Sequence, residues 1–237
     1  MNTYRILKVK RFPEYKDCKS LKDLHEMRLP GFTEDTITEI KNISEDFYGF
    51  EYFHIKHDMH IKDKGIAYGF HDDLPIALDF VDYKKRFEVK AYLNREKGYL
   101  LLAENSNVLN DLIRKLKKSQ FLKTEVEEYT LELKMLENIV DEYSGAWFRG
   151  VSSRVSSSAL YGADLSNEPL FNQLKEDGAE LSSIIVPYGG IQIQINKKCG
   201  ISSHMRLKSI EDELILIQSV KENLIDKIEN HSAQHFV

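Results

Sequence analysis

The sequence predicts an α+β protein in which an antiparallel β-meander is followed by helices and joined to a second small α/β sandwich. Between residues 47 and 104, apolar and polar residues alternate with a period of two, and aromatic and β-branched residues are enriched, as in half-buried strands. Residues 106–118 instead place apolar side chains at helical spacing. The 237 residues, 42% hydrophobic and 30% charged, are typical of a globular chain that can bury a sizeable core.

The first fifty residues contain one expected strand and two expected helices. Residues 4–10 alternate well enough to form the strand. A short helix is expected near 21–27 and a longer one at 33–46, where Thr33 can act as the N-cap. The apolar positions that favour the longer helix are Ile37, Ile40, Ile43 and Phe47.

Five closely spaced strands are expected next, at 48–57, 60–70, 75–83, 85–93 and 98–104. Turn-forming residues separate them at Lys64-Gly65, at 71–75 and at 94–98. Connections this short join antiparallel neighbours, so the pattern predicts a meander. The last strand is nearly all apolar and should be covered on both faces.

The clearest local signal is the segment 98–118, which reads GYLLLAENSNVLNDLIRKLKK. After its strand, Asn105, Ser106 and Asn107 compete for the N-cap of a helix. The helix carries one apolar stripe, formed by Val108, Leu109, Leu112, Ile113 and Leu116. Cations near a helix C-terminus stabilise it by roughly 0.3–1 kcal/mol each. The four basic residues in 114–118 exceed what that purpose needs.

The second half of the chain is expected to mix helices with short strands. A helix is predicted at 125–143, where apolar residues recur at alternating spacings of four and three. Strands are predicted at 146–151, 181–188 and 191–195, and another after Gly200. Ser166 or Asn167 can cap a short helix that ends at Gly178, and Ser209 can cap a final helix whose stripe Lys221 interrupts.

Charge divides the chain into two predicted domains, a β-meander domain with a basic helix at 1–123 and an acidic α+β domain with a C-terminal helix at 124–237. The first has 23 Lys/Arg and 20 Asp/Glu, and the second has 10 and 18. Cys18 and Cys199 share no spacing pattern and are expected to be free thiols. Without a signal peptide or a long apolar run, the sequence predicts a cytoplasmic protein that does not enter a membrane.

The functional hypothesis depends on a basic segment at 84–123, which holds 11 Lys/Arg and four Asp/Glu. If the hairpin near Lys84 lies beside the helix end near Lys118, their cations form one patch suited to a phosphate backbone. We therefore predict a non-catalytic nucleic-acid-binding or assembly protein, a subunit of a larger complex. The expected binding residues are Lys84, Lys85, Arg86, Lys90, Arg114, Lys115, Lys117, Lys118 and Lys123.

A metal-dependent nuclease is the alternative from a different class. Glu88 and Lys90 share one face of a strand, with Asp79 and Asp82 just before them. Clustered carboxylates can hold Mg²⁺ while a lysine orients the attacking water. The same acid-x-Lys triplet occurs at 14–16, 39–41 and 132–134, however, so it is weakly specific.

Two further observations complete the sequence-based hypotheses. His54, His57, Asp58 and His60 resemble a metal cluster by composition, but residues three apart in a strand face opposite sides, so exposed hairpin histidines are expected rather than zinc ligands. No catalytic residue, metal or cofactor is therefore assigned. The broad apolar face at 210–228 predicts a third alternative, a protein-interaction subunit that binds a protein partner or forms a homodimer without nucleic acid.

Overall fold

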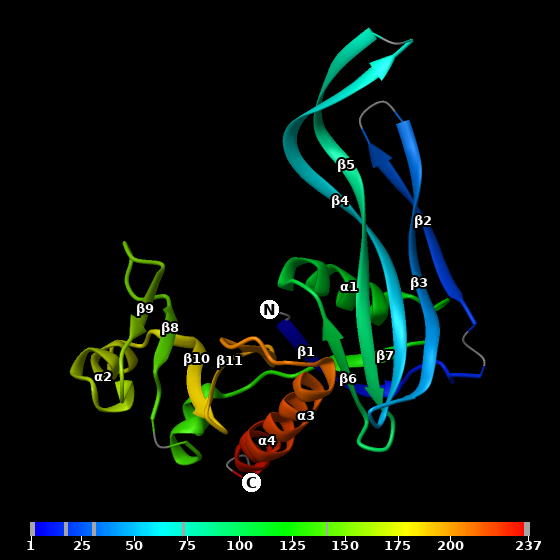
Figure 1. Ribbon diagram of the computed structural model, residues 1–237. Helices are drawn as coiled ribbons and strands as arrows, with labels where there is room; N and C mark the ends of the chain where they lie inside the picture. Colours follow the sequence, from blue (N-terminus) through cyan, green and yellow to red (C-terminus); the bar gives the residue numbers. More distant parts are fainter. Residues whose placement is uncertain (1–2, 17–18, 30–31, 73, 141, 235–237) are drawn as a thin grey trace. The chain divides into compact units, whose positions relative to one another are not determined.

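The computed structural model of the chain describes residues 3–16, 19–29, 32–72, 74–140 and 142–234 (Figure 1). The fold is α+β and mostly strand, and the recorded strand pairings are antiparallel. The chain folds into two compact units. These are a hairpin unit, Val9–Gly98 with Glu104–Val126, and a C-terminal unit, Met1–Lys8 with Tyr99–Ala103 and Glu127–Val237. The division at 123/124 remains a prediction about charge and composition.

The hairpin unit contains four consecutive strands in the order β2-β3-β4-β5. Their bounds are Leu21–Leu29, Phe32–Phe47, Phe50–His71 and Leu74–Asn94. Two register points fix the sheet, because Thr38 lies opposite His57 and Ile55 lies opposite Val89. The predicted turn at 94–98 is present, where the Lys97 N–H donates to Asn94 Oδ1 at 2.9 Å. Of these four strands, β4 and β5 lie in the segment where the period-two pattern predicted an antiparallel meander, whereas β2 and β3 do not.

Helix α1, Ser106–Lys118, covers one face of this sheet and confirms the sequence prediction for this helix. Asn105 is the N-cap, and its side chain accepts from the Val108 N–H at 3.1 Å. The whole predicted stripe is at most 2% exposed. The helix lies against β4, where Asp111 Oδ2 is 2.9 Å from His57 Nε2.

The predicted helices at 21–27 and 33–46 are wrong, because both segments are strands. In β3, Thr36, Thr38 and Ile40 alternate as buried residues, and Leu21 to Leu29 pair with Ile40 to Phe32. Isoleucines three apart are compatible with a helix, but threonine and isoleucine favour strands. The helical prediction depended on the isoleucine spacing and did not consider the threonines, two of which are buried.

The strands predicted as two pairs, 48–57 with 60–70 and 75–83 with 85–93, are each one long strand. The expected turn at Lys64-Gly65 is instead a bulge in β4, where the pairing shifts between Lys62 and Gly65. A bulge adds a residue to one strand and bends it without ending it. The turn at 71–75 is present, since His71 pairs with Leu74.

Two hairpins diverge within this unit, as Figure 1 shows at the upper ends of β2–β3 and β4–β5. The pairing of β3 with β4 ends at Thr38 and His57. Beyond this point, the carboxylate of Asp58 accepts the Ile37 N–H at 3.1 Å in place of a backbone carbonyl. Lys84 Nζ donates to the Asp35 carbonyl at 3.2 Å from the other hairpin. We call this region the fork.

The C-terminal unit contains the strand path β6-β1-β12-β11-β10-β8-β9. Here Tyr4 to Lys8 of β1 pair with β6, and Thr3 to Arg5 pair with β12. The predicted hairpin at Gly189-Gly190 is present, and both glycines have positive φ. The strands of this path are β1 Thr3–Arg11, β6 Tyr99–Ala103, β8 Gly145–Arg149, β9 Ser157–Tyr161, β10 Glu180–Tyr188, β11 Ile191–Asn196 and β12 Gly200–Ser203, and β7 Glu125–Glu128 pairs with β1. The last residues of β1 and the first two of β7 belong to the hairpin unit.

The predicted helix at 125–143 is wrong. Its first residues form β7, and its middle closes only a 3₁₀ turn, η1, at Leu133–Asn138. The Leu131 N–H donates to the Lys197 carbonyl at 2.8 Å, which ties the segment to the loop after β11. The apolar residues Tyr129, Leu133, Leu136 and Tyr143 are nevertheless buried. Their spacing therefore reflects positions in the core and not one face of a helix.

The remaining helices lie where the sequence predicted them, but the cap predicted at Ser166 or Asn167 is wrong, because the N-cap of the short helix is Glu168 and makes no side-chain cap bond. A short 3₁₀ turn, η2 at Leu165–Asn167, precedes α2 at Pro169–Glu176, and Ser209 caps α3 at Ile210–Val220 by accepting the Asp212 N–H at 3.1 Å. One π-helical turn, η3 at Lys221–Ile225, leads into α4 at Asp226–Gln234. The extra residue of this turn places Lys221 inside, 7% exposed, where Nζ pairs with Asp226 at 2.7 Å. The residue that interrupts the apolar stripe in the sequence, Lys221, is thus the first residue of a π-helical turn.

Within the described ranges, no helix is long and apolar enough to cross a membrane. Cys199 is a buried free thiol, and burial raises its pKa. Cys18 lies outside the described residues.

Strand β3 can be tested with two isoleucines that the helical reading placed on one stripe. Ile40 is 0% exposed and Ile43 is 46% exposed. We expect Ile40→Ala to lower the free energy of unfolding by about 2–5 kcal/mol through cavity formation, and Ile43→Ala to change it by about 0.5 kcal/mol or less. Urea denaturation measures both. Equal losses in the two variants would contradict the strand register.

Candidate nucleic-acid interface

Side-chain alternation gives the sheet of the hairpin unit two different faces. The covered face carries His57 and lies under α1. Successive residues point to opposite sides, so Asp58 and its neighbours in register belong to the other side, which we call the open face. The register of strands β2 to β5 therefore determines on which face each Lys or Arg side chain lies.

The covered face has one polar row among its apolar rows, running across the sheet through Asp23, Thr38 and His57. Thr38 Oγ1 lies 2.9 Å from His57 Nδ1, and His57 Nε2 lies 2.9 Å from Asp111 Oδ2. The hydrogen bond from His57 lowers the pKa of Asp111, against the opposing effect of partial burial. A hydroxyl, an imidazole and a carboxylate in series resemble a nucleophilic relay. However, Thr38 is 0% and His57 1% exposed, so the series joins α1 to the sheet.

The same row determines what part of the basic end of α1 remains for binding. Lys115 Nζ lies 2.8 Å from the carboxylate of Asp23, which is only 5% exposed. The Arg114 guanidinium pairs with Asp111 one turn earlier. Both side chains are thus engaged with carboxylates of their own unit, while Lys117 and Lys118 are exposed.

The open face carries charged side chains in five consecutive rows across the strands. All of them are exposed or half-buried except Asp58. From one end to the other the rows are Lys41–His54–Lys90, Lys22–Glu39–Lys56–Glu88, Asp58–Arg86, His60–Lys84 and Lys62–Asp82.

These rows contain seven Lys or Arg and four Asp or Glu, an excess of three positive charges without counting the histidines. The acidic residues hold neighbouring cations in place. Lys22 Nζ lies 3.5 Å from Glu39, and Arg86 makes two hydrogen bonds to Asp58 at 2.7 and 2.9 Å. The result is a positive surface whose members are partly preorganised.

Asp58 is the buried anchor of this face. Burial favours the neutral carboxyl, but hydrogen bonds from Arg86 and the Ile37 N–H outweigh it and lower the pKa of Asp58 overall. Asp58 therefore stays ionised at neutral pH and fixes Arg86 at the fork. Arg86 in turn leaves 48% of its side chain exposed, enough to contact a phosphate as well.

An aromatic series borders the charged rows at the closed end of the β3–β4 hairpin. The rings of Tyr52 and Tyr92 stack with centroids 5.0 Å apart, and Phe47 lies 5.2 Å from Tyr52. Burial, with a smaller contribution from the charge of Glu88, raises the pKa of Tyr52. Tyr52 lies two positions before His54 on β4, and its partner Tyr92 lies two positions after Lys90 on β5, so the aromatic series adjoins the charged rows on the same face. Tyr48 extends the series and is 52% exposed.

The structure divides the predicted patch between two surfaces. Lys84, Arg86 and Lys90 lie on the open face, whereas Lys85 has the opposite alternation and contacts the ring of Phe87 at 5.1 Å. The remaining predicted residues, Arg114, Lys115, Lys117, Lys118 and Lys123, lie on α1 or just after it. Helix α1 covers the face opposite Lys84, Arg86 and Lys90.

Sequence reasoning missed the other half of the open face. Its unpredicted basic or titratable members are Lys22, Lys41, Lys56, Lys62, His54 and His60. The period-two alternation of Lys56, Asp58, His60 and Lys62 was visible in the sequence and could have placed them together. Lys22 and Lys41 could not be found in this way, because their segments were assigned to helices.

The residues of the nuclease alternative do not converge. Asp82 and Glu88 share a face but are six positions apart on one strand, about 20 Å at 3.3 Å per residue. Asp79 has the opposite alternation to Asp82. Among the described side chains, no group of three or more His, Cys, Asp or Glu could hold a metal ion.

The histidines are divided in the same way. His54 lies 3.5 Å from Glu88 and His60 lies 2.7 Å from Asp82, both on the open face. His57 is buried on the covered face. The expectation of exposed histidines is therefore wrong for His57, which is 1% exposed, whereas His54 and His60 are half-buried and share the other face.

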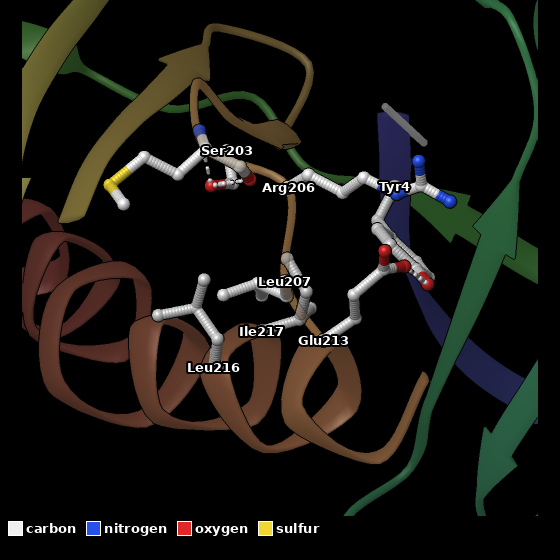
Figure 2. Close-up of a pocket in the computed structure, with 8 residues that line it drawn as sticks. Tyr4, Ser203, Arg206, Leu207, Glu213, Leu216 and Ile217 are labelled. Carbon is white, nitrogen blue, oxygen red and sulfur yellow. Dashed lines mark hydrogen bonds between the residues drawn. The ribbon is translucent and has the colours of Figure 1, made fainter. Parts of the chain in front are cut away.

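A small pocket of about 300 Å³ lies in the C-terminal unit, between β1, the loop after β12 and α3 (Figure 2). The Tyr4 hydroxyl donates to Glu213 in this pocket, and Leu216 and Ile217 form part of its apolar wall. The predicted binding residues do not line it. The Glu213 carboxylate in this pocket is thus already hydrogen-bonded to Tyr4.

Arg86→Gln should separate the structural role of Arg86 from that of its neighbours on the open face. Removing the guanidinium leaves the buried Asp58 carboxylate underpaired, so we expect a loss of about 1–3 kcal/mol in the free energy of unfolding at pH 7. The matched control Lys90→Gln removes an exposed cation and should change it by about 0.5 kcal/mol or less.

This loss should depend on pH in a defined direction. The folded-state pKa of Asp58 is lowered, so the stability it contributes is present above the ordinary carboxyl pKa of about 3.9 and declines as pH falls through the folded value. The difference between wild type and Arg86→Gln should therefore shrink below about pH 4. Urea titrations at several pH values measure it, and a difference that grows on acidification would refute this account.

Comparison with known proteins does not assign the chain to a family. No protein-family model matches the chain, and no curated protein matches its sequence significantly.

Proposed function

We propose that this protein binds nucleic acid without cleaving it, through the open face of the hairpin unit, as a subunit of a larger assembly. The observation that carries the proposal is the composition of five adjacent rows on one face, with seven Lys or Arg against four Asp or Glu. A surface with this excess attracts a phosphate backbone independently of sequence.

The arrangement of the cations supports a backbone-directed mode of binding. Side chains two apart on a strand lie about 6.6 Å apart, and neighbouring strands are about 4.8 Å apart, so the cations form a lattice and not a single point charge. Lys41, Lys56 and Lys90 lie at the end nearest the aromatic series. Contacts of this kind position a nucleic acid but do not read its sequence.

The protein-interaction alternative receives less support from its original surface. Leu214, Ile217, Val220, Leu224 and Ile228 of the C-terminal helices are at most 4% exposed. Ile215 is 59% exposed, and one exposed isoleucine is ordinary on a protein surface. The broad apolar face thus packs mainly within its own unit.

The proposal is tested by binding fluorescently labelled oligonucleotides at several salt concentrations. The logarithm of the association constant should fall linearly with the logarithm of salt concentration, by about 0.7 for each phosphate contact to a single strand. The double variant Lys41→Glu/Lys90→Glu should weaken binding at least about tenfold and reduce the slope by about 1.4. Circular dichroism should confirm that the variant is folded.

A matched reversal distinguishes the two basic surfaces. Lys118→Glu/Lys123→Glu changes the same formal charge on exposed residues at and beyond the end of α1. We expect it to weaken binding less than about threefold, the residual effect of net charge. If this control loses affinity and the open-face variant does not, the helix end is the interface and the proposal fails.

The same assay addresses the nuclease alternative. With Mg²⁺ or Mn²⁺ added, the probe should remain full length, because the carboxylates of the open face are spread along the strands and not gathered around one ion. Metal-dependent cleavage that Lys90→Ala abolishes would support the nuclease instead.

A further inference from the structure

We infer that the open face accepts single-stranded nucleic acid and that Tyr48 stacks on one of its bases. This inference rests on the proposed function and specifies its ligand. The evidence for it is Tyr48 itself, which is not one of the charged residues of the open face and which is sterically unfavourable in its hairpin turn.

Tyr48 occupies a sterically unfavourable position in the β3–β4 turn. Phe47 pairs with Phe50, so the loop consists of Tyr48 and Gly49 alone. Their φ angles are 55° and 80°, and positive φ at both positions is characteristic of a type I′ turn. Asn, Asp or Gly is preferred at the first position because a bulky L-residue is strained there.

The protein gains little burial from this strained residue. Tyr48 remains 52% exposed, and its ring makes an edge-to-face contact with Phe47 at 4.7 Å. The turn is held by a different interaction, the hydrogen bond from the Gly49 N–H to Asp46 Oδ1 at 3.0 Å. Neither packing nor turn formation therefore accounts for a tyrosine, and strain of this kind points to a functional role.

The position of Tyr48 supplies that role. The ring continues the series of Tyr92, Tyr52 and Phe47, which borders the row containing Lys41 and Lys90. The row lies four positions beyond Phe50 on β4, about 13 Å at 3.3 Å per residue, so one short single strand can place a base on the exposed ring and a phosphate on the row. In a duplex the base faces are already stacked on one another, so this contact selects single strands.

The experiment compares labelled oligothymidylate and oligouridylate of about 12 nucleotides, a length within the range one small module can cover, with a duplex of equal length. Tyr48→Asn introduces a residue preferred in this turn, so the midpoint of urea unfolding should stay the same or rise. Its affinity for single strands should fall about tenfold. Tyr48→Phe keeps the ring and should bind like wild type. The duplex should bind more weakly and equally to all three proteins.

The outcomes separate this inference from the proposed function. If wild type binds single strands and Tyr48→Asn binds them equally well, or if wild type prefers the duplex, the inference is overturned while salt-dependent binding through the cations still stands. If wild type binds none of the probes, both are overturned. A loss of affinity in Tyr48→Asn that Tyr48→Phe does not share, with unfolding unimpaired, supports the inference, and the two single strands show whether DNA or RNA is preferred.

Discussion

The hairpin unit depends on the packing of α1 against one face of a four-stranded antiparallel sheet. Once the helix buries its apolar stripe there, strand alternation assigns every charged residue of β2 to β5 to one side or the other. Lysines that are neighbours in the sequence, such as Lys84 and Lys85, consequently face different environments. The positive surface arises from pairing between strands and not from any continuous basic segment.

The packing of α1 also includes polar contacts, and these limit how the sheet can be built. Asp111 and Lys115 lie one turn apart and reach His57 and Asp23 in the same row. Buried polar groups of this kind are costly unless they are paired, so the row constrains the helix to one register on the sheet. Because Lys115 is paired with Asp23, it contributes less to the exposed positive charge that the sequence predicted at the end of α1.

Much of the fold could be predicted from local patterns. The cap at Asn105, the stripe of α1, the Gly189-Gly190 hairpin and the cap at Ser209 all depend on residues within a few positions of one another. The errors have a common cause: a segment such as 33–46 satisfies a helical and a strand pattern equally, and the strand wins through its pairing with residues distant in sequence. Of the open face, Lys84, Arg86 and Lys90 were predicted. Lys41 was not, because its segment was assigned to a helix, and Lys56 was not, although its alternation with Asp58, His60 and Lys62 was visible in the sequence. The pairing of Arg86 with Asp58 depends on the register between β4 and β5, which the local sequence does not reveal.

The path of the chain has a consequence for how this protein can be dissected. The hairpin unit comprises two separate segments, and the C-terminal unit comprises three. Strand β1, at the start of the chain, pairs in its first half with β12, which lies about 200 residues later. Any single cut within the chain therefore removes a strand or a helix from at least one unit and does not release two intact modules. After limited proteolysis, the fragments would remain associated through strand pairing. A genetic truncation would remove core residues of at least one unit together with the surface under study. Point substitutions, and not deletions, are the appropriate means to study each unit separately.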